Sequence, residues 1–380
     1  MTVPLSDTDR AYLEQAVRIA DRGWGRVHPN PLVGCLLVKD GTVIAEGWHA
    51  EYGGPHAEAM ALTLAGDRAR GATAYVSLEP CRHEGRTPPC SRALRRAGVA
   101  RVVYGAADPG GDSGGGGDEL RAAGVEVVGP TFTERRARAL NPAFHHRFRS
   151  DRPWVALKLA TSIDGGIAAR AGEQSWLTGP EARDEVHRLR ASVDGVMVGA
   201  RTARTDDPRL TVRVGAPPRV PPVRIVLDPR ATTPLDGALL RTAREVPVWI
   251  FTGPEAPDAA LAAIEAAGAV VHPVGSAGPH ALDLDEVLRR CGERGISALL
   301  CEGGGRLGAA LARADLVDRL ALFVAPRVLG AEAVPAFPDW PAPVGAVAAP
   351  GPDSGWVPAA PPRALGVDSL LVFDRIREHD

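Results

Sequence analysis

The chain has 380 residues, of which 45% are hydrophobic and 24% charged, and its net charge at pH 7 is −2. At about 150 residues per domain this length predicts two domains, and the composition excludes a fibrous or wholly disordered chain. The charge excludes a global field that attracts nucleic acid or anionic membranes. The apolar runs fall short of the ~20 residues that span a bilayer, and the first residues do not resemble a secretion signal, so we expect a cytoplasmic protein. Five cysteines then favour reduced or metal-bound thiols over a disulfide framework.

The first part of the chain alternates between helix and strand, which favours a layered α/β sheet. The predicted elements are helices at 6–22, 56–65, 90–97 and 133–140, a hairpin around Asp40-Gly41, and strands at 72–78, 99–105 and 125–128. The glycine-rich segment 108–118 is predicted to be a mobile loop, because glycine raises the entropy cost of ordering a chain. The polar, arginine-rich segment 145–152 is interpreted as the end of this domain.

A second alternation begins at Trp154 and is interpreted as a separate domain, so the predicted domains are 1–148 and 149–380. Residues 335–362 are rich in proline and are predicted to form a low-complexity loop. The elements predicted in this half are strands at 155–159, 193–198, 224–227, 246–251, 296–301, 320–324 and 369–376, and helices at 180–191, 259–267 and 306–313.

One histidine and two cysteines have the spacing of a catalytic zinc site. His56 opens a helix, Cys81 follows a strand after a proline, and Cys90 precedes a helix. Three protein ligands leave the fourth position of a tetrahedral zinc open for water, whose pKa the metal lowers toward about 7, and Glu58 could move protons between that water and a leaving amine. The pattern matches the zinc nucleobase deaminase signature, except that eight residues rather than two separate the cysteines.

An isolated cysteine is more often a small buried hydrophobe than a ligand. The other three cysteines lie in apolar runs or an ordinary helix and are interpreted in that way: Cys35, Cys291 and Cys301.

The segment Glu302–Gly308 contains G-x-G-x-x-G between a predicted strand and a predicted helix. The backbone amides of a glycine-rich segment have no side chains in the way, so they can approach a pyrophosphate at the positive end of the following helix. The motif comes late in the chain, however, and the next strand ends in Arg327 rather than in an acidic residue, so a standard Rossmann domain is not expected. A plain glycine-rich turn is the alternative.

The chain contains only two lysines among its 44 basic residues. Lys39 precedes the hairpin turn, whereas Lys158 lies in the apolar strand VALKLA, where an unpaired charge would be costly. Glu302, at the end of another strand, is a plausible partner. The pair is interpreted either as catalytic or as a structural salt bridge.

The motifs HPNPLVG (28–34), PHAE (55–58) and EPCRHEGRTPPC (79–90) resemble the deaminase half of the bifunctional riboflavin-biosynthesis deaminase/reductase family. The resemblance implies a cytidine-deaminase-like three-layer α/β/α domain with one Zn²⁺ per chain. It also implies that Glu58 is the proton shuttle. The zinc ligands would be His56, Cys81 and Cys90, and the residues near the pyrimidine or the phosphoribosyl group would be Asn30, His49 and His83. For these last three, a turn residue and two solvated histidines are the alternatives. The chain departs from the family at Gly110-Gly111, where the family usually has Asn-Pro.

The motifs KLATSIDG (158–165), GEQSWLTGPEAR (172–183), ARTDDPRLTVR (203–213), RIVLD (224–228) and EGGGRL (302–307) resemble the reductase half of the same family. The resemblance implies a dihydrofolate-reductase-like α/β domain that binds NADPH. The implied NADPH contacts are Ala160, Trp176, Thr202, Asp206, Gly304, Gly305, Arg306, Leu307, Gly308, Ala309 and Ala310. The implied substrate contacts are Gln174, Arg190, Leu210, Arg213 and Glu302.

Several features of this reductase half bear on chemistry. The guanidinium groups of Arg190 and Arg213 suit a clamp on a 5′-phosphate. We hypothesise that Lys158 and Glu302 position, and protonate, the ribosyl nitrogen or oxygen as hydride arrives at C1′. Pro229 stands where the family commonly has a serine, and the preference for NADPH over NADH rests on the resemblance rather than on particular residues.

We therefore interpret the chain as a bifunctional enzyme of riboflavin synthesis. It would deaminate 2,5-diamino-6-(5-phosphoribosylamino)pyrimidin-4(3H)-one with zinc and then use NADPH to produce 5-amino-6-(5-phosphoribitylamino)uracil. One alternative is a deaminase with a degenerate reductase domain. A nucleic-acid-editing deaminase is disfavoured by the net charge, the long segment between the cysteines and an aromatic content of 5%. We expect a small-molecule substrate and neither nucleic acid nor membrane as a partner; a homo-oligomer is left open.

Overall fold

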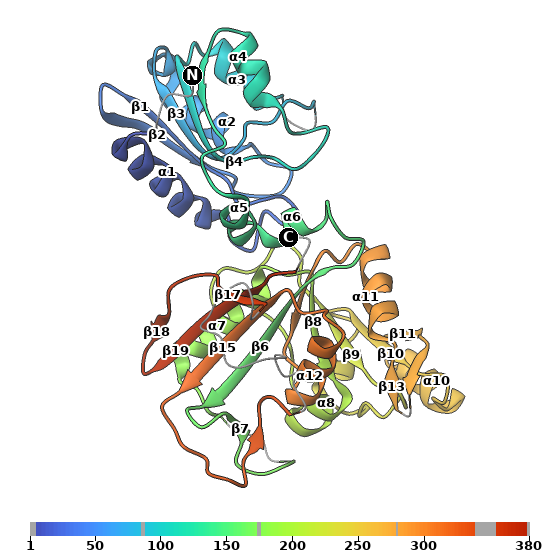
Figure 1. Ribbon diagram of the computed structural model, residues 1–380. Coiled ribbons are helices and arrows are strands. Elements are labelled where there is room, and N and C mark those ends of the chain that lie inside the picture. The colour runs from blue at the N-terminus through green and yellow to red at the C-terminus, as the bar shows by residue number, and fades with distance from the viewer. Residues whose placement is uncertain (1–4, 85–87, 173–175, 279, 339–354, 378–380) are drawn as a thin grey trace. The chain divides into compact units, whose positions relative to one another are not determined.

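The computed structural model describes residues 5–84, 88–172, 176–278, 280–338 and 355–377 (Figure 1). The chain divides into two compact units, Met1–Ser150 and Asp151–Asp380, and the predicted boundary lies two residues before this division. Both units are α/β, which confirms the predicted class. Within the described ranges, none of the helices combines the length and the apolar character that crossing a bilayer requires.

The first unit is built on a five-stranded sheet in the order β2-β1-β3-β4-β5. The hairpin predicted around Asp40-Gly41 joins β1 to β2, and β1 is antiparallel to both β2 and β3, whereas β3, β4 and β5 are parallel. The strands are β1 (Gly34–Lys39), β2 (Thr42–Trp48), β3 (Thr73–Leu78), β4 (Arg101–Ala106) and β5 (Glu126–Val128). The helices are α1 (Asp7–Ala20), α2 (Ala57–Ala65), α3 (Cys90–Arg96), α4 (Gly116–Ala122), α5 (Glu134–Leu140) and α6 (Pro142–His146), with short 3-10 turns at η1 (Asp21–Gly23) and η2 (Gly66–Ala69).

Helices cover both faces of this sheet. Successive residues of a strand point to opposite faces, so Leu36 packs with Leu13 of α1, whereas Leu37 packs in the other cluster with Ala61 of α2 and Leu94 of α3. Burying each leucine contributes roughly 1.5–3 kcal/mol to folding. The predicted three-layer α/β/α arrangement is therefore confirmed.

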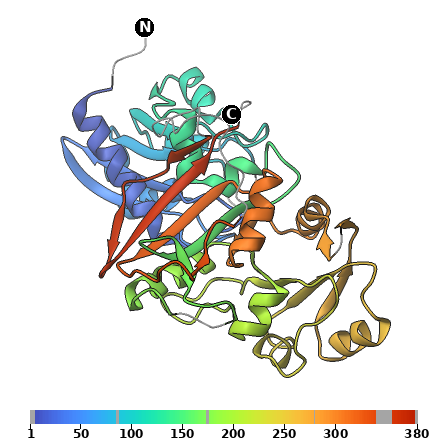
Figure 2. The same cartoon turned by 60° about the horizontal axis from the view of Figure 1, so that its bottom comes forward.

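The second unit is built on a long mixed sheet in the order β11-β10-β9-β8-β14-β6-β15-β19-β17, with β18 also paired to β19 (Figures 1 and 2). The strands from β11 to β15 along this path are parallel, and β19 is antiparallel to its neighbours. Its strands are β6 (Trp154–Ser162), β8 (Gly195–Gly199), β9 (Val223–Leu227), β10 (Val248–Thr252), β11 (Val270–Pro273), β14 (Ala298–Cys301), β15 (Arg319–Ala325), β17 (Trp356–Pro358), β18 (Arg363–Leu365) and β19 (Asp368–Arg375). Two small sheets pair β7 (Gly166–Ala168) with β16 (Val334–Pro335) and β12 (Ser276–Gly278) with β13 (Ala281–Leu282).

The predicted helices of this unit are found within one residue of their predicted ends. They are α7 (Pro180–Ala191), α10 (Asp258–Ala266) and α12 (Gly305–Arg313). The sequence did not predict α8 (Ala200–Asp206), α9 (Ala238–Arg241) or α11 (Leu284–Glu293). The predicted loop 335–362 is wrong at its end, where β17 forms, and 339–354 lie outside the described residues.

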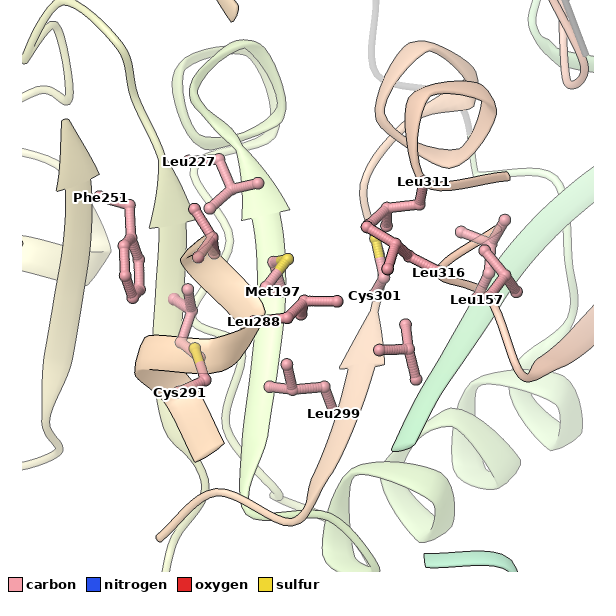
Figure 3. Close-up of a cluster of buried hydrophobic side chains, with 14 of the residues drawn as sticks. Leu157, Met197, Leu227, Phe251, Leu288, Cys291, Leu299, Cys301, Leu311 and Leu316 are labelled. Atoms are coloured by element: carbon pink, nitrogen blue, oxygen red, sulfur yellow. The ribbon is translucent and has the colours of Figure 1, made fainter. Parts of the chain in front are cut away.

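The core of the second unit lies between the sheet and α11 and α12 (Figure 3). Met197, Leu227 and Leu299 project from neighbouring strands toward Leu288 of α11. Cys291 and Cys301 are fully buried in the same cluster, and burial raises the pKa of each thiol to about 12. Both cysteines therefore stay protonated, in agreement with the predicted packing role.

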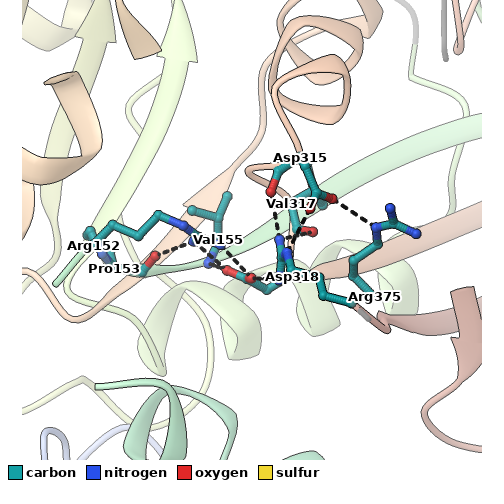
Figure 4. A network of polar contacts seen from close by, with 8 residues as sticks. Arg152, Pro153, Val155, Asp315, Val317, Asp318 and Arg375 are labelled. Atoms are coloured by element: carbon teal, nitrogen blue, oxygen red, sulfur yellow. Dashed lines mark hydrogen bonds and ion pairs between the residues drawn. The ribbon is translucent and has the colours of Figure 1, made fainter. Parts of the chain in front are cut away.

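A buried carboxylate joins the start and the end of this unit (Figure 4). Asp318 accepts two hydrogen bonds from Arg152 at 2.7 and 2.8 Å and one from the backbone N–H of Val155 at 2.8 Å. Arg377, near the end of the chain, donates to the same carboxylate at 2.7 Å. The Asp318 side chain is only 6% exposed and that of Arg152 16%, so loss of Asp318 would remove a largely buried carboxylate that pairs with both arginines.

His272 on β11 offers a test of the second core through pH. Its ring packs against Trp249 and Phe251, its Nε2 has no hydrogen-bond partner among the described residues, and burial lowers its pKa to about 4. A histidine in the unfolded chain takes up a proton near pH 6.5, whereas folded His272 does so only near pH 4. The free energy of unfolding therefore decreases as pH falls from about 6.5 toward 4. We predict that His272→Phe raises the free energy of unfolding at pH 5 by about 1–3 kcal/mol, in urea titrations, and changes it by less than about 1 kcal/mol at pH 8. Equal pH dependence in the two proteins would contradict this account.

Candidate active sites

The three predicted zinc ligands come together in the first unit. His56 is the N-cap residue of α2, Cys90 is the first residue of α3, and Cys81 lies just beyond β3. His56 Nδ1 is 3.5 Å from Cys81 Sγ and 3.3 Å from Cys90 Sγ, and the three donor atoms lie within 4.8 Å of one another. A tetrahedral zinc with ordinary bond lengths would place nitrogen and sulfur donors roughly 3.5 Å apart. The donor set and its spacing therefore fit zinc.

The local backbone favours the ionised form of one sulfur. The N–H of Cys90, at the start of α3, donates to Cys81 Sγ at 3.5 Å. The Cys90 side chain and the His56 imidazole lower the pKa of Cys81 well below that of an ordinary thiol, although burial opposes them. A thiolate is the form in which cysteine binds a metal.

Glu58 lies in the first turn of α2, two residues beyond the His56 ligand. The residue is 3% exposed, and burial together with the Cys81 charge raises the pKa of its carboxyl to about 7. A carboxyl with this pKa can both accept and release a proton near neutral pH. Its position and its acidity suit the predicted proton shuttle.

Two more predicted residues, Asn30 and His49, form a hydrogen-bonded pair. His49 Nδ1 lies 2.9 Å from the carbonyl oxygen of Pro55, so this nitrogen must donate. Burial lowers the pKa of His49, which leaves Nε2 as an acceptor for the Asn30 amide nitrogen at 3.1 Å. Asn30 then has Oδ1 as the atom with which it can accept a donor from a ligand.

Five of these residues line one cavity of about 360 Å³, namely Asn30, His49, His56, Glu58 and Cys81, and the Cys90 sulfur lies 3.3 Å from His56 Nδ1 beside it. The cavity also includes His83, as predicted, and four residues that the sequence did not single out: Asp108, Phe144, Arg147 and Phe148. The last three fall in or next to 145–152, which the sequence analysis interpreted as a polar end of the domain. A signal was present, because Phe144 and Phe148 are four residues apart and flank an arginine.

The glycine-rich segment differs from its prediction. The predicted loop is wrong beyond residue 115, because Gly116–Ala122 form α4. Its first part is held by Arg82, whose backbone N–H donates to the Ser113 carbonyl and whose guanidinium donates to the Gly111 carbonyl. Glu79 accepts from the N–H of Gly117 at 3.0 Å, so both sides of the segment are attached to the residues around Cys81 that follow β3.

Three of the predicted cofactor residues, Ala160, Thr202 and Gly304, lie near the carboxyl ends of three neighbouring strands, β6, β8 and β14. A Cβ on Gly304, the N-cap of α12, would lie 4.0 Å from Thr202 Oγ1, and nothing else is nearer than 3.9 Å. Ala160 lies near the end of β6. This open backbone at a helix start fits a dinucleotide phosphate, which can approach amides that have no partner within the helix.

Other residues of the predicted cofactor set have packing roles. Gly308 packs on Leu157, Gly305 packs on the Ala336 carbonyl, and Ala309 is buried. Two others, Arg306 and Ala310, lie along α12, and Leu307 packs on Gly303. Asp206 ends α8, and Trp176 is 65% exposed beside the Arg183 guanidinium. The predicted substrate contact Gln174 lies outside the described residues.

The hypothesised ion pair between Lys158 and Glu302 is wrong. Because Leu157 is paired with Cys301 in register, Glu302 does follow beside Lys158. Its carboxylate, however, accepts two hydrogen bonds from Arg190, at 2.6 and 2.9 Å. Burial raises the pKa of Glu302, but the Arg190 charge outweighs burial and holds it below its usual value. A bidentate guanidinium pair competes better for a carboxylate than an ammonium does.

Lys158 is left without an ion pair among the described residues, with its ammonium 5.6 Å from the ring centre of Phe323. Burial lowers the pKa of Lys158, and the nearby Glu302 charge opposes this effect only in part. Asp206 faces the same ammonium, and burial raises the pKa of its carboxyl. An ammonium in this setting releases its proton more readily than an exposed lysine.

The predicted phosphate clamp is also arranged differently. The third guanidinium nitrogen of Arg190, Nη1, donates to the Thr211 carbonyl at 3.0 Å. Each of the three nitrogens therefore already has a protein partner, either Glu302 or Thr211. Arg213 is exposed and donates from its guanidinium to Thr211 Oγ1 at 3.2 Å. Leu210 is 2% exposed, so its side chain packs inside the unit.

The glycine at position 116 is predicted to be necessary for the zinc site. A Cβ there would lie 1.8 Å from the carbonyl oxygen of Pro80, the residue before Cys81, whereas a Cβ on Gly111 would meet nothing within 4 Å. We expect Gly116→Ala to displace Cys81 and to weaken zinc binding by about tenfold or more, measured by competition with a chromophoric chelator. Gly111→Ala is the matched control and should bind zinc like the unchanged protein. Equal zinc affinity in both variants would contradict the proposed role of the close backbone contact.

Comparison with known proteins gives a consistent family. A family model of the cytidine and deoxycytidylate deaminase zinc-binding region matches residues 6–106, and a model of the RibD C-terminal domain matches residues 153–344. The riboflavin biosynthesis protein RibD of Actinobacillus pleuropneumoniae is 41% identical over 330 residues, which are 85% of each chain. The protein of the same name from Escherichia coli is 39% identical, over 86% of this chain and 89% of its own.

Solved structures lead to the same family. RibD of Acinetobacter baumannii, in its form 1, is 33% identical with a TM-score of 0.77, over 97% of this chain and 99% of its own. A Thermotoga maritima protein described as a diaminohydroxyphosphoribosylaminopyrimidine deaminase/5-amino-6-(5-phosphoribosylamino)uracil reductase is 31% identical, also with a TM-score of 0.77 and the same coverage. The chain therefore belongs to the RibD family of bifunctional riboflavin biosynthesis enzymes, in which a zinc-binding deaminase domain precedes a reductase domain.

Proposed function

We propose that the first domain, residues 1–148, removes the 2-amino group of 2,5-diamino-6-(5-phosphoribosylamino)pyrimidin-4(3H)-one, and that the second, residues 149–380, reduces the ribosyl group to give 5-amino-6-(5-phosphoribitylamino)uracil. The observation that carries the proposal is the shared cavity of His56, Cys81 and Glu58, with the Cys90 sulfur beside them. One zinc per chain would be held by the three donors. Bound there, zinc supplies a hydroxide nucleophile at neutral pH.

In the deamination, a carbon–oxygen bond forms at C2, the bond from C2 to the amine breaks, and ammonia leaves. Glu58, two residues beyond His56 and in the same cavity, takes the proton from the attacking water and passes it to the departing nitrogen. Asn30 Oδ1 accepts from an N–H of the pyrimidine, because His49 already holds the amide nitrogen. The burial of Glu58 keeps bulk water away from this proton.

In the reduction, NADPH supplies hydride to C1′ of the ribosyl group. Lys158 Nζ donates the proton that the ribosyl oxygen or nitrogen takes up, and its lowered pKa favours this transfer. Glu302, fixed by Arg190, orients the sugar, and Arg213 contacts the 5′-phosphate from the exposed side. We propose a small-molecule substrate, with no nucleic acid or membrane as a partner, and a cytoplasmic location.

The alternative of a degenerate reductase domain is disfavoured by one observation. Thr202 and Gly304, which are far apart in the chain, face each other across an open backbone position. Backbone without a side chain at the carboxyl ends of parallel strands leaves room for a dinucleotide cofactor to approach. Purified protein that releases ammonia but oxidises no NADPH would favour the alternative.

The two reactions should be separable by substitution. We predict that Glu58→Gln keeps zinc but loses ammonia release by about 10²-fold or more, and that it still oxidises NADPH when supplied with the deaminated pyrimidine. Loss of both activities would indicate that Glu58 acts on the fold instead.

Lys158→Met should show the opposite pattern, with ammonia release intact and NADPH oxidation reduced by about 10²-fold or more. The matched control is Lys39→Met, which removes the other lysine of the chain, a half-buried one at the end of β1 that donates to the Arg70 carbonyl at 2.9 Å. An unchanged reductase rate in folded Lys158→Met would exclude the proton-donor role.

A further inference from the structure

The deaminase cavity has a buried end and an exposed end. Glu58 and Cys81 are 3% and 8% exposed, whereas Phe148 is 43% exposed and Arg147 is also exposed. The carbon that loses its amine must reach Glu58, so a bound pyrimidine fills the buried end. A substituent on that pyrimidine then extends toward Arg147.

The charges that line this cavity are unevenly distributed. Arg147 is the one arginine or lysine among the described lining residues. Four carboxyl groups line the same cavity, those of Glu58, Glu79, Asp108 and Asp112. A dianionic substituent would be repelled by such a wall unless a permanent cation faced it. The charge balance of the cavity therefore directs an anionic group to Arg147.

The Arg147 side chain is held in place before any ligand binds. It follows α6, and its guanidinium carbon lies 4.6 Å from the ring centre of Phe144 and 4.8 Å from that of Phe148. Contact with aromatic faces orients a guanidinium and limits the entropy that it loses on binding.

Most of the hydrogen-bonding capacity of Arg147 is unused. Nη1 donates to the carbonyl oxygen of Pro29 at 3.2 Å, which is the single hydrogen bond of its five N–H groups in the described part of the chain. Partial burial lowers the pKa of Arg147, and the nearby Asp108 charge opposes this effect without forming an ion pair with Arg147 among the described residues. A charge in this state gains from an anionic partner.

Two further features of the cavity point to a ligand near this arginine. His83 Nδ1 is buried and has no hydrogen-bond partner among the described residues. A Cβ on Gly110 would lie 3.4 Å from the Phe148 ring and 2.1 Å from Ser113 Oγ, so glycine here lets the segment close beneath Phe148.

We propose that Arg147, clamped between Phe144 and Phe148, binds the 5′-phosphate of the deaminase substrate. The proposal rests on the function proposed above, which places a phosphoribosyl group on the pyrimidine. A phosphate monoester suits this position because a guanidinium donates two parallel hydrogen bonds to two phosphate oxygens. Arg147 is thus a binding residue that selects the phosphorylated pyrimidine over its dephosphorylated form.

The test measures ammonia release from the phosphorylated diaminopyrimidine and from its dephosphorylated riboside, with zinc-loaded full-length protein. For Arg147→Gln we expect KM for the phosphorylated compound to rise about 10–100-fold, with kcat and the KM for the riboside within about twofold of the unchanged protein. Ribose 5-phosphate should inhibit the unchanged protein competitively, and its Ki should rise by about tenfold or more in the variant. The KM of Arg147→Lys for the phosphorylated compound should lie between those of the unchanged protein and Arg147→Gln, because lysine keeps the charge but loses the paired donors.

The control is Arg18→Gln, which removes an exposed arginine from α1, away from the cavity, and should behave like the unchanged protein on both compounds. An equal loss on the phosphorylated compound and the riboside would show that Arg147 acts through the fold, and would overturn the proposal. No change on either compound would also overturn it. If the unchanged protein deaminates neither compound, the proposed function is wrong and the phosphate assignment is wrong with it; deamination of both without a phosphate effect contradicts the phosphate assignment alone.

Discussion

The convergence of one imidazole nitrogen and two sulfur atoms is the constraint around which the first unit is built. His56 Nδ1 is 3.5 Å from one sulfur and 3.3 Å from the other, although the ligands come from the start of α2, the chain after β3 and the start of α3. Each of these elements must end or begin at the same edge of the sheet. The start of α4 holds the segment between β3 and α3 in place. Gly116 packs closely on the Pro80 carbonyl, and the N–H of Gly117 donates to Glu79.

The two sites use buried glutamates in opposite ways. Glu58 lies next to a thiolate and in a low-dielectric setting, so the pKa of its carboxyl rises to about 7 and the group can carry a proton. The Glu302 side chain is 9% exposed, and the bidentate contact with Arg190 lowers its pKa and keeps it an anion. The same residue type therefore serves as a proton carrier in one unit and as a fixed charge in the other, and the partner group decides which.

Sequence reasoning succeeded where a motif is local and failed where a partner comes from a distant element. The order H-x-E, P-C and C selected three side chains whose donor atoms lie within 4.8 Å of one another, and the periodicity of α7, α10 and α12 located these helices within a residue. The α11 helix was missed although the sequence carries its signal, because Val287, Leu288 and Cys291 have helical spacing among charged residues and Asp283 caps the first turn. Glu302 was assigned to Lys158 because a lysine in an apolar strand needs a partner and Glu302 ends another predicted strand, whereas the approach of Arg190 from α7 could not be inferred from the sequence.

The sequence by itself determined the two α/β units, the metal donors and the family, because these depend on hydrophobic periodicity and on short spacings along the chain. Tertiary structure alone decided which side chains share the deaminase cavity, since Arg147 and Phe148 reach it from more than fifty residues beyond Cys90. It also decided that the glycine run begins a helix rather than a loop, because the absence of a side chain there serves a close backbone contact. Contacts of this kind depend on how elements pack across a sheet, and packing leaves little trace in the local order of residues.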